Sequence, residues 1–360
     1  MPCVPSAHER PERRAELLPI AGLGRGGPRR EAIDRGRGAH ARPLATPAAA
    51  VAEVDPRAAA VRPPALDIII PARGEGATLE ACLDSIADDA GGLDLLVVVI
   101  VNGPDRGATL EAAARGHRRL DSAGVPVRII EASSAGKASA LNRGDAERRG
   151  CAAVYLDADV TLLPGTLTSL AGTLSGSAAV LAAPPLRLAP SRSPITRAFA
   201  RVWSSLPAVA GDVVGAGCYG VSAAGRERWR DFPDLVADDA FVRSCFLKAE
   251  RRLTDSGGFV VTFPDGARLI RTVSRWHAGN RQLRLLPPGR GGERRDPGAG
   301  PWRNLAHVVR RVDVWPNLPA YLYVRAAAAL VAYRGSGSAW APVRQPVPRG
   351  GTDTVEPTDV

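Results

Sequence analysis

Short apolar runs alternate with longer segments of mixed apolar and polar residues between about residue 65 and residue 160. The apolar runs are four to seven residues long and rich in β-branched side chains, which is typical of buried strands. We therefore expect strands over 66–70, 95–101, 127–130 and 152–156, with helices over 78–87, 108–120 and 137–149. This alternation predicts an α/β fold with a Rossmann-type, mostly parallel sheet flanked by helices on both faces.

The pattern is less regular in the second half of the chain. We expect strands over 179–182, 213–221 and 259–263, helices over 237–250 and 272–286, and an amphipathic helix over 319–333. The segment VVGAGCYGV at 213–221 is apolar but contains three glycines.

Composition divides the chain into four parts. Residues 1–64 are rich in Ala, Arg, Pro and Gly without periodicity, and we expect a disordered basic tail. Residues 65–286 form the predicted α/β domain, whose two halves are 65–160 and 161–286. The breaker-rich segment 287–300 is expected to be a linker, and 301–360 a partly helical C-terminal extension with a frayed end.

The net charge of +10 lies in the two ends of the chain. Residues 1–64 carry eleven Arg against seven acids, and residues 281–360 carry twelve Arg against six. No aromatic pattern accompanies this charge, so we do not expect nucleic-acid binding. Contact of a basic end with an anionic membrane surface remains open.

Cysteine usage and hydropathy bear on the compartment. The five cysteines are scattered without a CxxC pair, which favours buried thiols in a reducing compartment over disulfides or a zinc site. We find no uninterrupted apolar run of membrane-spanning length and no secretory signal at the start. A cytoplasmic protein is expected.

Two carboxylates follow the predicted strand at 152–156. Asp157 and Asp159 are two residues apart, so in extended backbone both side chains point to the same side, at the edge where parallel sheets bind ligands. Carboxylate oxygens suit Mg²⁺ or Mn²⁺, which keeps open positions for substrate phosphates. The alternative is an Asp-rich turn that caps the helix expected near residue 164.

Other polar residues follow the remaining strands. Lys137 is one of only two lysines in the chain and opens a predicted helix, where an ammonium suits phosphate or ribose oxygens. Pro71, Arg73 and Glu75 follow the first strand and Asn102 ends the second, so Glu75 and Asn102 are candidates to bind a base and ribose. A surface lysine and ordinary turn chemistry are the competing interpretations.

Two further groups lie in the second half. Asp238 and Asp239 stand at the start of a predicted helix, where either one is a candidate general base or both oppose the helix dipole. Arg271 and Arg275 share a helix face by their spacing of four, and together they are candidates to clamp a diphosphate beside Trp276. A solvated helix with a partly buried Trp is the alternative.

Seven short segments follow one another in a consistent order: IIIPARGE (68–75), VVIVNGPDRGAT (98–109), GKASALNRG (136–144), YLDADV (155–160), GAGCYGVSAAGRERW (215–229), ADDAFV (237–242) and RTVSRWHAG (271–279). Together they resemble the family 2 glycosyltransferases, which have the GT-A fold. The resemblance implies a metal-dependent, inverting transfer of a sugar from a nucleotide diphosphate donor to an acceptor hydroxyl, with Mg²⁺ or Mn²⁺ as cofactor.

The resemblance also implies that 65–160 is the nucleotide-binding half and 161–286 the acceptor half, and it implies roles for the candidate residues. The donor would be held by Pro71, Arg73, Glu75, Asn102, Lys137, Asp157, Arg275 and Trp276. The metal would be held by Asp159, the more direct ligand, and by Asp157. The base would be Asp239, with Asp238 as the second candidate.

The chain departs from the family pattern at three positions. Gly74 stands where Asn is common, Asn102 replaces a more usual aspartate, and Thr272 occupies the position of the glutamine in the QxxRW element. That element is typical of processive synthases with several membrane helices. Its partial loss favours a single transfer over polymerisation.

Two other functions remain open. A sugar nucleotidylyltransferase would need a Gly-rich loop directly after the first strand, and IIIPARGE does not supply one. A catalytically silent protein bound to the inner face of the membrane is compatible with the basic ends and the helix at 319–333. The acceptor, whether carbohydrate, lipid-linked or another small hydroxyl compound, is expected to contact loops within 183–235.

Overall fold

The computed structural model describes residues 64–103, 106–133, 136–285 and 301–334. The predicted basic tail, apart from its last residue, and the predicted linker at 287–300 lie outside the described residues. The N-terminal part of the chain, Met1–Ala59, is a unit separate from Ala60–Val360. All elements described below belong to the second unit.

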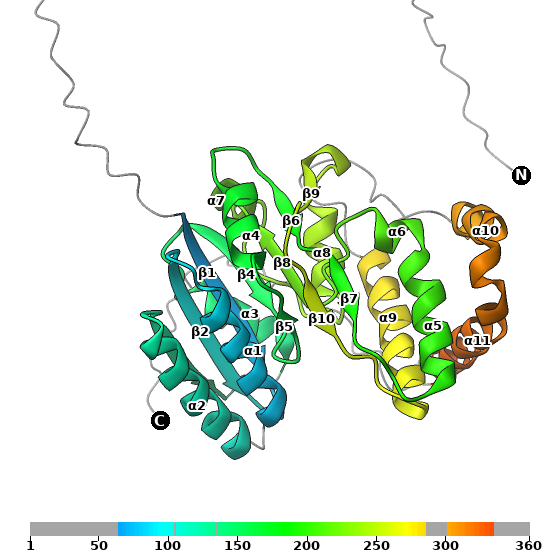
Figure 1. Ribbon diagram of the computed structural model, residues 1–360, viewed down its shortest axis with the longest axis horizontal. Helices are drawn as coiled ribbons and strands as arrows, with labels where there is room; N and C mark the ends of the chain where they lie inside the picture. The colour runs from blue at the N-terminus through cyan, green and yellow to red at the C-terminus, as the bar shows by residue number, and fades with distance from the viewer. Residues whose placement is uncertain (1–63, 104–105, 134–135, 286–300, 335–360) are drawn as a thin grey trace, which may run out of the picture. The chain divides into compact units, whose positions relative to one another are not determined.

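The centre of this unit is a seven-stranded, mostly parallel sheet (Figure 1). Its strands, in spatial order, are β3 (Val127–Ala132), β2 (Asp94–Asn102), β1 (Ala65–Ala72), β4 (Ala152–Leu156), β8 (Cys218–Val221), β6 (Leu181–Ala183) and β9 (Arg251–Leu253). Strand β8 runs antiparallel to both of its neighbours, and the other described pairs are parallel. A smaller sheet consists of β5 (Thr161–Leu162), β10 (Phe259–Val261) and β7 (Leu186–Leu188).

Helices surround the sheet and extend beyond it. They are α1 (Gly76–Asp89), α2 (Gly107–Ser122), α3 (Lys137–Asp145), α4 (Thr166–Leu174), α5 (Pro194–Ser205), α6 (Pro207–Ala210), α7 (Ala223–Arg226), α8 (Asp238–Ser244), α9 (Ala267–Leu285), α10 (Pro301–Arg310) and α11 (Leu318–Arg334). Two short 3-10 helices lie at Lys248–Glu250 and Val312–Asn317.

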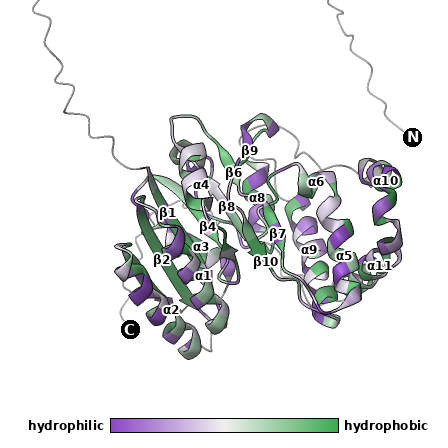
Figure 2. Ribbon diagram, in the orientation of Figure 1, coloured by the Kyte–Doolittle hydropathy of each residue, from purple (hydrophilic) through white to green (hydrophobic). Residues whose placement is uncertain are grey.

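The central strands are apolar on both faces because both faces are covered. Ile68 and Ile70 of β1 pack in one cluster with the apolar residues of α1, α2 and α4. Ile69, between them, packs on the opposite face with Leu141 of α3. Strands β1 and β2 are green along their length in Figure 2, which marks them as hydrophobic. The continuous apolar runs in the sequence follow from this two-sided burial.

Several predicted elements are shorter than the sequence pattern indicates. The strand predicted over 213–221 is confirmed only at Cys218–Val221, because Gly215 and Gly217 adopt positive φ and bend the chain out of the sheet. The helix predicted over 137–149 ends at Asp145, and the one predicted over 237–250 ends at Ser244. The hydrophobic pattern therefore located these elements but overestimated their length.

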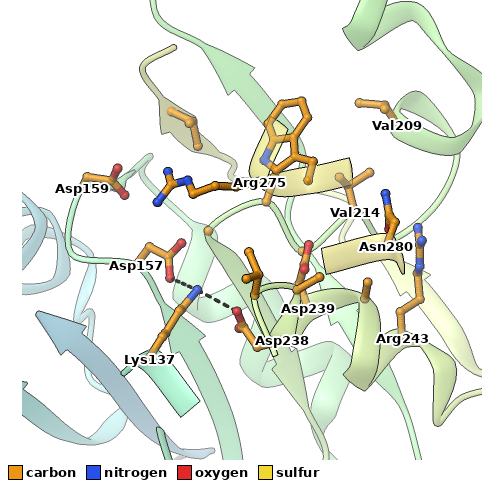
Figure 3. A pocket seen from close by; sticks show the side chains of 18 of the residues that line it. Lys137, Asp157, Asp159, Val209, Val214, Asp238, Asp239, Arg243, Arg275 and Asn280 are labelled. Atoms are coloured by element: carbon orange, nitrogen blue, oxygen red, sulfur yellow. Dashed lines mark ion pairs between the residues drawn. The ribbon is translucent and has the colours of Figure 1, made fainter. Parts of the chain in front are cut away.

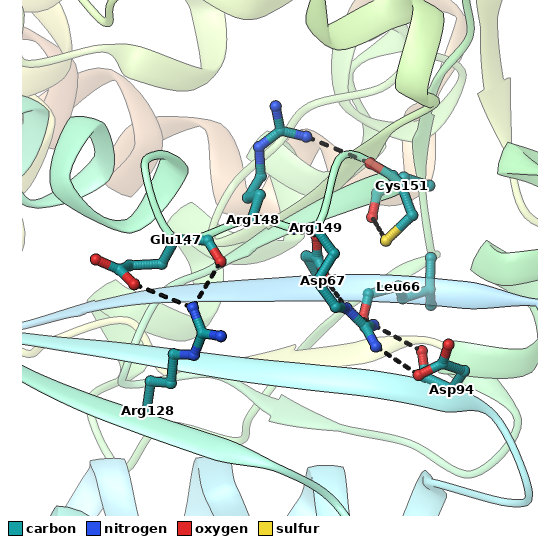
Figure 4. Close-up of polar contacts among 9 residues, drawn as sticks. Leu66, Asp67, Asp94, Arg128, Glu147, Arg148, Arg149 and Cys151 are labelled. Carbon is teal, nitrogen blue, oxygen red and sulfur yellow. Dashed lines mark hydrogen bonds and ion pairs between the residues drawn. The ribbon is translucent and has the colours of Figure 1, made fainter.

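A buried carboxylate stabilises the ends of the central strands that lie away from the predicted site. Asp67 of β1 is fully buried and accepts hydrogen bonds of 2.7 Å from the backbone nitrogen and from Nε of Arg149. The same guanidinium also bonds to Asp94 at the start of β2 (Figure 4). Arg149 therefore joins β1 and β2 to the loop before β4, which compensates the buried charge of Asp67.

The C-terminal helix packs on the second half of this unit. Val324 and Ala328 of α11 are buried in a cluster with Phe199 of α5 and Val273 of α9. These helices lie side by side in Figure 1. Within the described ranges, none of the helices is both long enough and apolar enough to cross a membrane.

Candidate active site

The carboxyl ends of the central strands open into a cavity of about 840 Å³. Eleven of the twelve candidate site residues from the sequence line this cavity: Pro71, Arg73, Glu75, Asn102, Lys137, Asp157, Asp159, Asp238, Asp239, Arg275 and Trp276. Arg271, the proposed partner of Arg275, does not line it. The folded chain thus brings together residues from six segments, while their individual roles remain predictions.

Asp157 and Asp159 lie directly after β4. The backbone nitrogen of Asp157 donates a hydrogen bond of 2.8 Å to the carbonyl oxygen of Gly217. A Cβ added to Gly217 would lie 2.6 Å from Cγ2 of Val160, so only glycine allows this approach without a shift. The glycine-containing segment before β8 therefore fixes the loop that carries both carboxylates.

Lys137 lies between carboxylates from the two halves of the domain (Figure 3). Its Nζ is 2.7 Å from Oδ1 of Asp157 and 3.0 Å from Oδ1 of Asp238. Burial disfavours the charged ammonium, but the two carboxylates outweigh this and raise the pKa of Lys137. The side chain is therefore a fixed cation within the cavity.

The neighbouring acids are less well compensated. Burial, together with the charges of Asp159 and Asp157, raises the pKa of Glu75 to about 7, although a hydrogen bond from the backbone of Arg73 opposes the shift. Burial and the charge of Asp157 also raise the pKa of Asp159. The carboxyl groups of Glu75 and Asp159 therefore hold their protons more tightly than ordinary carboxyl groups.

The acids at the start of α8 differ in their surroundings. Asp238 is 5% exposed and accepts a hydrogen bond of 3.3 Å from the hydroxyl of Tyr219. Burial and the charge of Asp238 raise the pKa of Asp239 to about 6. Gly215 has a φ of +69°, and a Cβ there would lie 2.7 Å from Cβ of Asp239. Asp239 therefore packs so closely against the backbone of Gly215 that only glycine fits at this position without a shift.

Asn102 positions the loop that leads to Lys137. Its side chain is 3% exposed, and Nδ2 donates a hydrogen bond of 2.9 Å to the carbonyl oxygen of Gly136. Gly136 has a φ of +121° and precedes the first residue of α3. The amide predicted to contact the donor thus also holds the turn before α3.

Arg275 and Trp276 approach the cavity from α9. Figure 3 shows Arg275 extended toward Asp159, and its charge partly counteracts the raised pKa of that carboxyl. Trp276 stacks on Trp203 with ring centroids 5.5 Å apart and also contacts Phe263. The tryptophan is therefore both a wall of the cavity and part of an aromatic cluster.

Several cavity residues were not anticipated from the sequence. They come from α8, α9, α10 and α11, and they are Arg243, Asn280, Asn304, Tyr321 and Arg325. Within 183–235, where loops were expected to contact the acceptor, the lining residues Trp203, Ala208 and Val209 lie instead on helices α5 and α6, and Leu206 lies between these helices. The sequence predicted the helices α8, α9 and α11, but not the packing that brings these side chains to the cavity.

Polar residues at the carboxyl ends of the central strands, beside the reversed strand β8, lie where open α/β sheets bind their ligands. Residues 67–229 match the family model described as Glycosyl transferase family 2, and this match supports a glycosyltransferase. A search of curated proteins returned no match.

Two solved structures are similar to the chain. One is the mannosyltransferase PcManGT from Pyrobaculum calidifontis in complex with GDP-Man and Mn²⁺, at 20% identity and a TM-score of 0.47, covering 79% of this chain and 83% of the other. The second is glucosyl-3-phosphoglycerate synthase from Mycobacterium tuberculosis with Mg²⁺ and UDP, at 20% identity and a TM-score of 0.40, covering 61% and 79%. At these values the likenesses add no argument about function.

Proposed function

We propose that this glycosyltransferase is metal-dependent and inverting, and that it moves one sugar from a nucleotide diphosphate donor to an acceptor hydroxyl. The observation that carries the proposal is the meeting of Asp157, Asp159, Lys137 and Asp239 around one cavity. Thr272, in place of the glutamine of processive synthases, supports a single transfer. The lack of a Gly-rich loop after β1 disfavours a nucleotidylyltransferase.

The carboxylates suit a divalent ion that is also held by the donor. Mg²⁺ is commonly bound by one or two carboxylates together with substrate phosphates. Within the described ranges, no group of three or more His, Cys, Asp or Glu side chains forms a metal site by itself. Asp159 and Asp157 fit the smaller set of one or two carboxylates, so phosphates of the donor would complete the coordination. The ion would supply charge neutralisation for the departing diphosphate.

The protein residues then have separate tasks. Lys137 and Arg275 place positive charge beside the diphosphate. Asp239 accepts the proton of the acceptor hydroxyl, whose oxygen forms a bond to the anomeric carbon. The bond from that carbon to the diphosphate breaks on the opposite side, and the nucleoside diphosphate leaves. The raised pKa of Asp239 makes it a stronger base than an ordinary aspartate.

A thermal-shift screen tests this proposal. UDP-, GDP- and dTDP-sugars are added to the full chain with and without Mn²⁺, and the melting temperature is recorded. We expect one nucleotide class to raise the melting temperature, with a larger rise when Mn²⁺ is present. No response to any donor, or an equal response in the presence of a chelator, would argue against a metal-dependent transferase.

We further propose that the enzyme is cytoplasmic and that α11 contacts a bilayer containing anionic lipids. Leu322, Tyr323, Leu330 and Tyr333 are 49% to 77% exposed and lie on one face of the helix. Residues 301–334 carry five Arg and one Asp, which complements anionic headgroups. Exposed Tyr side chains are typical of membrane interfaces.

Sedimentation with vesicles tests the membrane contact. The chain should sediment with anionic vesicles and less with zwitterionic ones. Leu322→Glu combined with Leu330→Glu should release it, whereas Ile195→Glu, at a residue 45% exposed on α5, should not. A dimer that forms through this face, detected by gel filtration and abolished by the same double variant, would contradict the proposal.

A further inference from the structure

A second cavity of about 240 Å³ adjoins the acceptor side of the site. It is lined by His277, Asn280, Arg281, Arg284 and Arg325. Asn280 and Arg325 line the main cavity as well, so the two cavities share a wall. The two cavities are therefore neighbours across the side chains of Asn280 and Arg325.

Helix geometry explains why these side chains gather. His277, Asn280, Arg281 and Arg284 are spaced at i, i+3, i+4 and i+7 along α9, which places them on one face. Arg325 comes from α11, which packs against α9. The cavity is therefore built by two rigid helices, and not by a loop.

The lining is positively charged and carries no carboxylate among the described residues. It contains three guanidinium groups, one imidazole and one amide. Burial, together with the charges of Arg325 and Arg281, lowers the pKa of His277, so a positive field acts on the ring. Its Nε2 is buried without a hydrogen-bond partner in the described part of the chain. These features indicate a site for an oxyanion.

We infer that the acceptor carries a phosphate group, which binds in this second cavity while its hydroxyl lies at Asp239. The inference rests on the proposed function. Guanidinium groups bind phosphate through paired hydrogen bonds, and those of Arg284 and Arg325 at a small cavity favour a phosphate ester over a neutral sugar. The phosphate takes no part in the bond changes. It anchors the acceptor, and the only bond formed joins its hydroxyl oxygen to the donor sugar.

Inorganic phosphate is the probe for this site. It is titrated calorimetrically into the full chain saturated with Mg²⁺ and the nucleoside diphosphate that the donor screen selects, so that the donor site is filled. We expect saturable binding that weakens at least tenfold in Arg284→Gln and disappears when Arg325→Gln is added. Arg271→Gln is the matched control, because Arg271 is exposed on the same helix but lines neither cavity, and its affinity should stay within twofold.

The outcomes separate this inference from the proposed function. No saturable binding to the wild type, or equal losses in Arg284→Gln and Arg271→Gln, would overturn the phosphate site. Nucleoside diphosphate binding is measured on the same variants, and its absence from the wild type would count against the proposed function alone. In that case the phosphate titration is repeated without nucleotide, where the same losses in the variants would still support the site.

Competition then distinguishes the source of the phosphate group. Displacement of inorganic phosphate by glycerol phosphate would support a soluble acceptor. Displacement only by vesicles that contain phosphatidic acid would support a lipid-linked one. If neither displaces it, the site binds phosphate but not a phosphate ester, and the acceptor assignment is wrong.

Discussion

The Nζ of Lys137 lies 3.0 Å from Oδ1 of Asp238, which joins the start of α3 to the start of α8. The two residues come from the two predicted halves of the domain. Their contact places the proposed base, the next residue along α8, beside the carboxylates that follow β4. The donor side and the acceptor side of the cavity are therefore connected by one ion pair.

Replacement of this lysine tests its part in donor binding. Lys137→Met should weaken donor affinity by about tenfold or more, since a hydrogen bond to a charged group is worth about 1.5–3 kcal/mol. Lys248→Met is the matched control, because Lys248 is the other lysine of the chain and is exposed outside the cavity. Calorimetric titration of both variants provides the measurement. Equal donor affinities in Lys137→Met and Lys248→Met would show that Lys137 does not contribute to donor binding.

Replacement of the proposed base should separate activity from stability. Asp239→Asn should lower the transfer rate by about 100-fold or more while donor binding survives. It should also stabilise the free enzyme at pH 7.5 by about 1 to 2 kcal/mol, because each unit of pKa shift is worth about 1.4 kcal/mol and this carboxyl is only partly shielded from water. Loss of donor affinity with retained turnover would argue against the assignment.

The raised pKa of Asp239 also predicts the pH dependence. The carboxyl must be deprotonated to act as a base, so the transfer rate should fall as the pH drops through about 6 and be flat above 7. Stability should change in the opposite direction. The folded state holds this proton more tightly than the unfolded state. The contribution of this group to the free energy of unfolding should therefore decrease as the pH rises from 3.8 to about 6. A transfer rate that is constant from pH 5 to pH 8 would exclude Asp239 as the base.

Gly215 offers a test of how Asp239 is positioned. Gly215→Ala places a Cβ 2.7 Å from Cβ of Asp239 and forces a positive φ on alanine, so Asp239 must shift. We expect the transfer rate to fall by about tenfold to 100-fold with little change in donor affinity. Gly172→Ala is the control, since nothing lies within 4 Å of its added Cβ and α4 should gain up to about 1 kcal/mol. Similar rates in the two variants would contradict the predicted role of this contact.

The buried pair at the opposite edge of the sheet should affect stability alone. Arg149→Met leaves the carboxylate of Asp67 buried without its partner and should cost about 2 to 4 kcal/mol in urea unfolding. Adding Asp67→Leu should recover much of this loss. The transfer rate per folded molecule should stay unchanged, because neither residue lines the cavity. Arg118→Met, at an exposed residue of α2, is the control. If Arg149→Met is as stable as Arg118→Met, the predicted cost is wrong.

Much of the donor side could be predicted from the sequence because it depends on local pattern. A buried parallel strand must be continuously apolar, so its carboxyl end can be located from the first polar residue after it. Asn102, Asp157 and Glu75 were found in this way. The boundaries of α3 and α8 were less predictable, since helix ends depend on the contacts of the last turn.

The sequence by itself determined which strands are followed by polar residues, the class of enzyme and eleven residues that line the cavity. Only the tertiary structure decided that Lys137 pairs with both Asp157 and Asp238, and that α11 brings Arg325 beside α9 to form the second cavity. The physical reason is distance along the chain. Periodicity reports which face of an element is apolar, but the partner of that face is chosen by packing between segments that are far apart in sequence.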